Sequence, residues 1–224
     1  MGGWEEPLTK NPGNFRVLIT ALLLSVLLCP TVLFARRSVR VGIYQNPPKV
    51  FVDESGVPAG IFIDVLRHIA AAEDWELQFV EGSWAEGLER LASGQLDLMP
   101  DVAYTAERAR NFSFHSVPVL SSWFQVYAHR GSRIQSILDL AGKKIAVLQG
   151  SVQQDTFAPM VKSFGLEVTL VAAPDYESVF TAVVRGEADA AIANQFYGNM
   201  NAKKLGLEDT AIIFNPSACI LPLH

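Results

Sequence analysis

Arg108 is the first candidate for a ligand-binding residue in this 224-residue chain, because of its type and its position. It lies in the segment from Asp97 to Ser116, where an apolar strand ends near Asp101 and Thr105 is placed to cap a short helical turn. At the start of that turn its guanidinium offers a planar pair of N–H donors that fits a carboxylate. The alternative is an ordinary solvated arginine like the neighbouring Arg110. The segment therefore predicts either a carboxylate clamp or a polar surface turn.

A second candidate is an anion site at the start of a predicted helix. The stretch LQGSVQQD, from Leu148 to Asp155, passes from a strand through Gly150 into a helix. The backbone N–H groups of Ser151, Val152 and Gln153 then have no partner within the helix, and such helix ends bind anions. The alternative is a plain helix start that Ser151 caps.

Other kinds of chemistry have weak support in the sequence. The four histidines show no metal-ligand spacing: they are His68, His115, His129 and His224. There is no Gly-x-Ser-x-Gly elbow and no phosphate-binding loop. A net charge of −5 without a basic run gives no electrostatic footprint for nucleic acid, so we expect no nucleic-acid partner.

The first 38 residues predict export. The run from Val17 to Ala35 carries no charge, follows Lys10 and Arg16, and can be a signal peptide removed after Ala35 or an uncleaved membrane anchor. Either interpretation places the remainder outside the cytoplasm, in the periplasm or beyond it.

The two cysteines fit an exported protein that relies on its core. Cys29 lies within the leader and Cys219 stands alone near the end, so the mature chain cannot form an internal disulfide. Hydrophobic residues make up 50% of the chain, which is enough for one large core or two small ones. This combination favours a bacterial envelope protein over a small disulfide-stapled module.

The elements that must position these candidates occur twice. LASGQLDLM at Leu91–Met99 and VVRGEADAA at Val183–Ala191 both predict a helix end, a glycine stop and an Asp that opens an apolar strand. The elements preceding each copy also match. In the first half they are a strand at Val39–Gln45, a helix at Ile61–Asp74, a strand at Trp75–Glu81 and a helix capped by Ser83. In the second half they are a strand at Lys144–Gly150, a helix from Ser151 to about Phe164, a strand at Glu167–Ala172 and a helix from Asp175 to Arg185.

This order predicts two α/β lobes. Alternating strands and helices with short links indicate parallel sheets covered by helices. Ligands of open α/β sheets bind beyond the carboxyl ends of the strands, so two lobes would place two such edges across one cleft.

The same segments carry a family resemblance from about Val39 to the end. VGIYQNPPKVF, GxLDLMPDVAYTAERARNFSF, DLAGKKIAVLQGS and GEADAAIANQ occur in order and at family spacing. The chain resembles the family 3 extracellular solute-binding proteins, of the polar amino-acid binding type with the two-lobed type II periplasmic-binding-protein fold. The resemblance implies residues 39–125 in lobe 1, 126–214 in lobe 2 and 215–224 in a return crossing, with hinges near 122–129 and 214–222. The family continues beyond the position matching His224, so it also implies a first lobe that is incomplete at its C-terminal end.

The resemblance implies a set of ligand contacts. Arg108 would clamp a ligand carboxylate, with help from the backbone of Ser151, Val152 and Gln153. Aromatic rings at Tyr44 and Trp84 would enclose the ligand. Asp101, Ala103 and Tyr104 would line the first-lobe side.

Asn194 departs from the family pattern. Amino-acid binders of this family often hold the ligand ammonium with an Asp of the second lobe, and the matching residue here is Asn194, which cannot neutralise a cation. Either Asp101 substitutes from the first lobe, or the ligand is a carboxylate without an α-ammonium group. Asn194 can also simply cap the end of a strand.

The resemblance leaves two roles and one rival open. The family supplies binding proteins to ABC permeases and input domains to membrane sensors, and the segments around Trp123 and Phe196 resemble the sensory members more. We expect a small-molecule ligand, a permease or sensor output partner, and no cofactor or metal. The rival is an enzyme like cyclohexadienyl dehydratase, for which Asp101 and Glu107 are the nearest acid and base candidates.

Overall fold

The computed structural model of the chain describes residues 36–220 and 222–223, and the residues from Arg36 onward form one compact unit. The predicted leader lies outside the described residues, apart from its last three positions. In the part of the chain that the structure describes, no helix is both long and apolar enough to cross a membrane.

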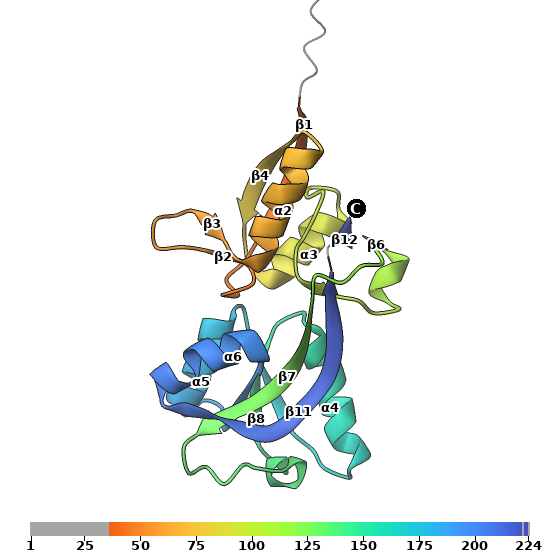
Figure 1. The fold of residues 1–224 in the computed structure, drawn as a ribbon. Helices are drawn as coiled ribbons and strands as arrows, with labels where there is room; N and C mark the ends of the chain where they lie inside the picture. Colours follow the sequence, from red (N-terminus) through yellow and green to blue (C-terminus); the bar gives the residue numbers. More distant parts are fainter. Residues whose placement is uncertain (1–35, 221, 224) are drawn as a thin grey trace, which may run out of the picture. The chain divides into compact units, whose positions relative to one another are not determined.

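The first lobe begins with a β-α-β unit (Figure 1). Strand β1 (Arg37–Ile43) pairs in parallel with β4 (Trp75–Glu81), and helix α2 (Ile61–Ala72) connects them. The helix buries Phe62, Ile63 and Leu66, which recur on one face at helical spacing. Helix α3 (Trp84–Ala92) follows and starts at the predicted cap, where Ser83 and Glu86 form a capping box.

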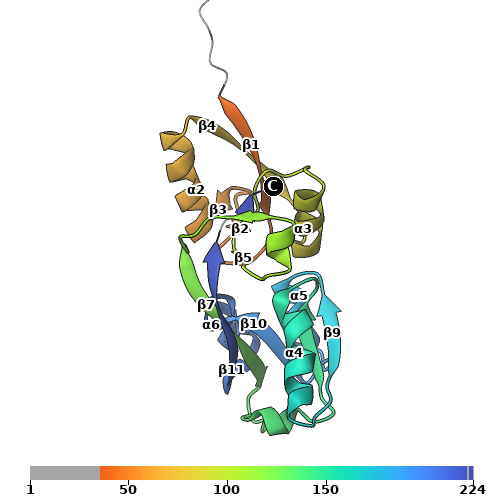
Figure 2. The same cartoon turned by 90° about the vertical axis from the view of Figure 1, so that its right-hand side faces the viewer.

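The second lobe is built on a six-stranded sheet in the order β5-β11-β7-β10-β8-β9. Its parallel strands are β8 (Lys144–Leu148), β9 (Thr169–Ala173) at one edge and β10 (Ala190–Asn194). Helix α4 (Val152–Ser163) covers one face, and α5 (Tyr176–Val184) and α6 (Gln195–Asn201) cover the other (Figure 2). Ala190 and Ile192 therefore pack with α4 residues, whereas Ala191 and Ala193 pack with those of α5.

The remaining elements are short. The strands are β2 (Phe51–Val52), β3 (Pro58–Ala59), β5 (Val102–Ala103), β6 (Ser113–Phe114) and β12 (Pro222–Leu223). The 3-10 turns are η1 (Arg108–Arg110), η2 (Ile137–Leu140) and η3 (Lys203–Leu205).

The duplicated turn is confirmed. Gly94 and Gly186 both adopt left-handed backbone, with φ of 70° and 73°, directly after α3 and α5. This region favours glycine because a side chain would crowd the backbone there. The next residue in each copy donates its N–H back to the helix end, Gln95 to Arg90 and Glu187 to Ala182, both at 2.8 Å.

The two aspartates of the turn make equivalent hydrogen bonds in the two lobes. Asp97 accepts a hydrogen bond from the backbone N–H of Arg40 at 2.8 Å, and Asp189 accepts one from that of Lys144 at 2.8 Å. Each is also near a cation, because the Arg40 guanidinium contacts Asp97 at 2.8 Å and Lys143 contacts Asp189 at 3.3 Å. The carboxylates thus fix the start of the strand beside them.

Two expectations about the sheets were wrong. Residues Leu96–Met99 do not form a regular strand, because Leu98 makes only an isolated parallel bridge to Val41. The second sheet is mixed rather than parallel, because β7 (Leu120–His129) and β11 (Leu207–Ile220) run antiparallel to their neighbours.

Strands β7 and β11 lie where the hinge crossings were predicted. They pair with each other along most of their length, and the far end of β11 reaches β5 at Cys219 and Ile220 (Figure 2). Their register shifts between Phe214 and Ser217, where Asn215 has a φ of 48°. A bulge of this kind bends and twists a strand pair, and a further register shift lies between Asp209 and Ile213.

Candidate ligand-binding site

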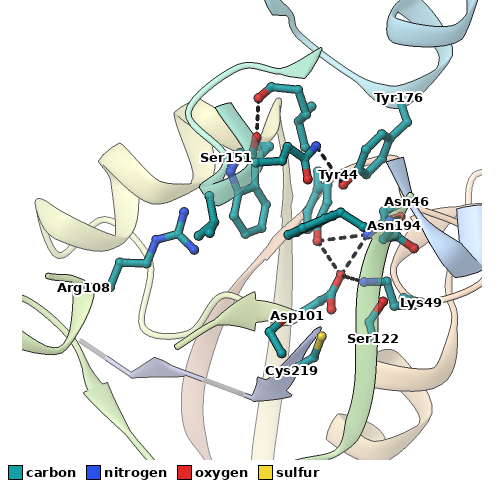
Figure 3. A pocket seen from close by; sticks show the side chains of 16 residues that line it. Tyr44, Asn46, Lys49, Asp101, Arg108, Ser122, Ser151, Tyr176, Asn194 and Cys219 are labelled. Carbon is teal, nitrogen blue, oxygen red and sulfur yellow. Dashed lines mark hydrogen bonds and ion pairs between the residues drawn. The ribbon is translucent and has the colours of Figure 1, made fainter. Parts of the chain in front are cut away.

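A pocket lies where the carboxyl ends of the parallel strands of both lobes meet (Figure 3). Tyr44 directly follows β1, and Asp101 follows the bridge at Leu98. From the second lobe, Ser151 follows β8 and Asn194 ends β10. The topology therefore gathers these side chains for the reason predicted, since parallel strands present their carboxyl ends on one edge.

Most of the predicted site residues line this pocket. The first lobe contributes Tyr44, Trp84, Asp101 and Arg108, and the second contributes Ser151, Val152, Gln153 and Asn194. The cavity has a volume of about 40 Å³, which is room for a few water molecules rather than for an amino acid. Side chains must move or the lobes must open before a solute of that size can enter.

Arg108 reaches from the first lobe to the second. Its backbone N–H donates to Thr105 Oγ1 at 3.1 Å, which confirms the predicted cap, and its Nη1 donates to the carbonyl of Ala103 at 3.2 Å. Its Nη2 lies 3.4 Å from the carbonyl oxygen of Gly150, and its guanidinium carbon lies 5.6 Å from the ring centre of Trp84. Burial lowers the pKa of Arg108, because water solvates the buried guanidinium less well than an exposed one.

The two predicted aromatic residues pack against each other beside this arginine. The rings of Tyr44 and Trp84 meet edge to face at 4.9 Å, and both residues are buried. Trp84 Nε1 donates to the Gly150 carbonyl at 3.1 Å, so the same oxygen takes donors from Trp84 and Arg108. Gly150 is thereby a contact point between the lobes.

The start of α4 presents two backbone donors to the pocket. Ser151 caps the helix by accepting from the N–H of Gln154 at 3.3 Å, as predicted. The expectation that its own N–H is free was wrong, because that group donates to Leu148 at 3.3 Å. Among the described residues, no hydrogen-bond acceptor contacts the backbone N–H of Val152 or Gln153. These two groups keep the anion-binding capacity of the helix end.

Gln153 has an unused acceptor. The residue is fully buried, and its Nε2 lies 3.3 Å from the hydroxyl of Tyr176. Its Oε1 has no hydrogen-bond partner in the described part of the chain. Tyr176 also lines the pocket and was not anticipated from the sequence.

A buried ion pair forms the floor of the pocket. Lys49 Nζ lies 2.5 Å from Asp101 Oδ2, and the two residues are only 3% and 6% exposed. The same oxygen accepts from the Tyr44 hydroxyl at 2.9 Å and from Asn46 Nδ2 at 2.8 Å (Figure 3). Burial would lower the pKa of Lys49, but the Asp101 carboxylate, together with smaller contributions from Cys219 and Tyr176, outweighs it and the pKa is raised, so the lysine carries its charge.

Asp101 holds an unusual backbone conformation in order to take part. Its φ is 61°, a region that L-residues other than Asn and Asp seldom adopt. Sequence reasoning missed Lys49 and Asn46, which lie in the turn-rich segment NPPKVF, and recognised only that this segment is a turn. An isolated lysine in a turn gives no signal that it will be buried.

Asn194 ends β10, caps the next helix and bonds to the first lobe. Its Oδ1 accepts from the N–H of Tyr197 at 3.1 Å and so caps α6, while its Nδ2 donates to Asn46 Oδ1 at 2.9 Å. The second bond joins the lobes, because Asn46 in turn donates to Asp101. An amide therefore stands on the second-lobe side of the ion pair, and it adds no charge.

Two predicted residues are not brought into the pocket. Ala103 lies in β5, opposite Cys219, and contributes only its carbonyl to Arg108. Tyr104 is 56% exposed and its ring packs edge to face against Phe114 at 5.4 Å.

Comparison with known proteins identifies the family. Residues 39–153, slightly more than half of the chain, match the model of the bacterial extracellular solute-binding proteins, family 3. The chain belongs to this family.

Relatives of this solute-binding chain include curated proteins and solved structures. It is 30% identical to the amino-acid-binding protein AabA of Dichelobacter nodosus, over 67% of this chain and 59% of that protein, so it spans about three-fifths of that relative's length. An ancestral arginine-binding protein bound to arginine superposes with a TM-score of 0.76 at 24% identity, over 84% of this chain and 85% of the other. A histidine kinase sensor domain superposes with a TM-score of 0.75 at 24% identity, over 84% and 83%. The last two show that the fold is shared.

Proposed function

We propose that this solute-binding chain captures an amino acid or a related small carboxylate between its lobes, outside the cytoplasm. Arg108 and the backbone N–H groups of Val152 and Gln153 would hold the carboxylate, and Tyr44 and Trp84 would enclose the solute. The observation that carries the proposal is the position of Arg108, whose guanidinium lines the pocket and reaches the second lobe at Gly150. AabA, named for amino-acid binding, supports the same class of ligand.

Replacing Arg108 tests the proposal. A ligand that binds only the folded form raises the melting temperature with concentration, so a thermal-shift screen of amino acids and small carboxylates should find one. Arg108→Ala should abolish the shift, and calorimetry should show at least about 100-fold weaker binding, because a charge-assisted bidentate contact is lost. Arg110→Ala is the matched control, since Arg110 lies on the same turn but is exposed. Equal affinity in the Arg108 variant would refute the clamp.

The enzyme alternative has less support from the site. Proton uptake by Asp101 would break its buried ion pair with Lys49 and leave that lysine without a counter-charge. Glu107 is exposed and does not line the pocket. Incubating purified protein with prephenate should therefore give no phenylpyruvate, and formation of that product would restore the alternative.

We favour signal sensing over uptake. The similarity of the fold to a histidine kinase sensor domain supports that role, although the family also works with ABC transporters. The coding sequence around the gene tests it, since a cytoplasmic output domain in the same reading frame indicates sensing and an adjacent permease indicates uptake.

A further inference from the structure

The charges that line the pocket do not suit a zwitterion. Among the described residues lining it, the charged ones are Lys49, Arg108 and Asp101, so the site carries two positive charges and one negative. Asp101 is already compensated by Lys49 at 2.5 Å. The positive charge of Arg108 remains, with Asp155 and Glu107 as the acidic groups that act on it from beyond the lining, and a solute carboxylate can pair with it.

An ammonium group would meet the wrong partners on the floor of the pocket. It has N–H donors and no acceptor, so it needs a carboxylate and must avoid other cations. The carboxylate within reach is that of Asp101, whose Oδ2 is taken by Lys49, Tyr44 and Asn46. Bringing a second cation next to the buried Lys49 is unfavourable because like charges repel strongly where water is excluded. Asn194, on the opposite lobe, supplies no charge to offset this.

A neutral hydroxyl would fit the same place. The second oxygen of Asp101, Oδ1, is buried and accepts no N–H or O–H donor from the described residues, and the Cys219 thiol beside this carboxylate is only a weak donor. An unused buried acceptor is costly, so it indicates a donor that arrives with the solute. The Lys49 ammonium has three N–H donors, of which Asp101 takes one, and it can donate to a solute oxygen. A hydroxyl can both donate to Asp101 Oδ1 and accept from Lys49.

We infer that the solute is a small hydroxycarboxylate, with its carboxylate on Arg108 and the start of α4 and its hydroxyl between Lys49 and Asp101. This inference rests on the proposed function of the same pocket and names the class of solute. Lys49 is then the residue that decides specificity, because it occupies the charge position that an amino acid would fill with its own ammonium.

Pairs of compounds that differ only at this group test the inference. We would titrate the full chain with lactate and alanine, malate and aspartate, 2-hydroxyglutarate and glutamate, and argininic acid and arginine. Thermal shift and calorimetry should show binding by the hydroxy member of at least one pair, with the amino acid at least about 100-fold weaker. A pair in which the amino acid binds as well or better, and loses affinity in Arg108→Ala, would overturn the inference while leaving the proposed function standing. If no compound binds, the proposed function fails and the inference with it.

Two variants of the floor sharpen the result. Lys49→Met should reverse the preference within the pair, because Asp101 then becomes free to take an ammonium. The matched control, Lys49→Met with Asp101→Asn, removes both charges and keeps the site folded if the single variant fails to fold. It should bind the two members of a pair within about tenfold of each other. A double variant that kept the full preference for the hydroxy acid would overturn the role of Lys49 and Asp101.

Discussion

Replacing Asp97 by asparagine should lower the free energy of unfolding at neutral pH and make it fall less steeply as the pH becomes acidic. The Asp97 carboxylate accepts from the Arg40 backbone N–H at 2.8 Å and from the guanidinium of Arg40 at 2.9 and 2.8 Å. The hydrogen bonds from the Arg40 side chain lower the pKa of Asp97 to about 2. A carboxyl group with a depressed pKa stabilises the fold above its unfolded value of about 3.9, and this contribution is lost as the pH falls toward 2.

The size of the effect follows from the pKa and from exposure. A decrease of the Asp97 pKa from about 3.9 to about 2 corresponds to about 2.5 kcal/mol in the free energy of unfolding for a group fully shielded from solvent. The side chain of Asp97 is 37% exposed, and solvent screening reduces the contribution to about 1 kcal/mol. About half of it should already be lost at pH 3.

Urea unfolding at pH 7, 5 and 3 measures this contribution. Asp97→Asn should be about 1 kcal/mol less stable than the original protein at pH 7, and the difference should shrink by about half at pH 3. Asp189→Asn, at the same position of the second copy, is the matched control and should cost less, because Lys143 contacts that carboxylate once, at 3.3 Å. A difference for Asp97→Asn that is independent of pH would refute the reasoning.

Three further outcomes are expected elsewhere in the molecule. Tyr127→Phe should raise the free energy of unfolding by about 1 kcal/mol, because the hydroxyl is buried without a partner among the described residues; a loss in denaturant midpoint would contradict this. Gly198→Ala should cost about 3 kcal/mol or more, since its new Cβ would lie 2.0 Å from Tyr127 Oη, and an unchanged melting temperature would argue against that packing. In a Cys29→Ser background, Cys219 should react with thiol reagents at pH 8 at least about 1,000-fold more slowly than free cysteine, because burial, with Asp101 adding to it, raises its pKa to about 12. Rapid labelling of the folded protein would show that this end of the cleft is open.

The repeating elements were predictable because their signals are local. Periodicity, glycine stops and capping residues lie within a few positions of the structure they direct, so β4 was found with its bounds and α3 with its Ser83 cap. The cleft followed from the order of these elements, since it requires only that the carboxyl ends of parallel strands share an edge.

The floor of the pocket was not predictable in the same way. Lys49 and Asp101 pair only when the turn after β1 packs against the segment after Leu98. The local sequence of neither segment indicates this contact. The family resemblance placed Tyr104 in the pocket, but the residue is 56% exposed and its ring packs on Phe114 instead.

The paired strands β7 and β11 also constrain how far and in which direction the lobes can travel. Two hydrogen-bonded strands can bend together but resist sliding past each other, because sliding breaks all the hydrogen bonds between them at once. The pair has register shifts between Asp209 and Ile213 and between Phe214 and Ser217, and bulges of this kind are the points where a strand pair bends. We therefore expect a solute that fills the cleft to bend this strand pair rather than to slide one lobe past the other.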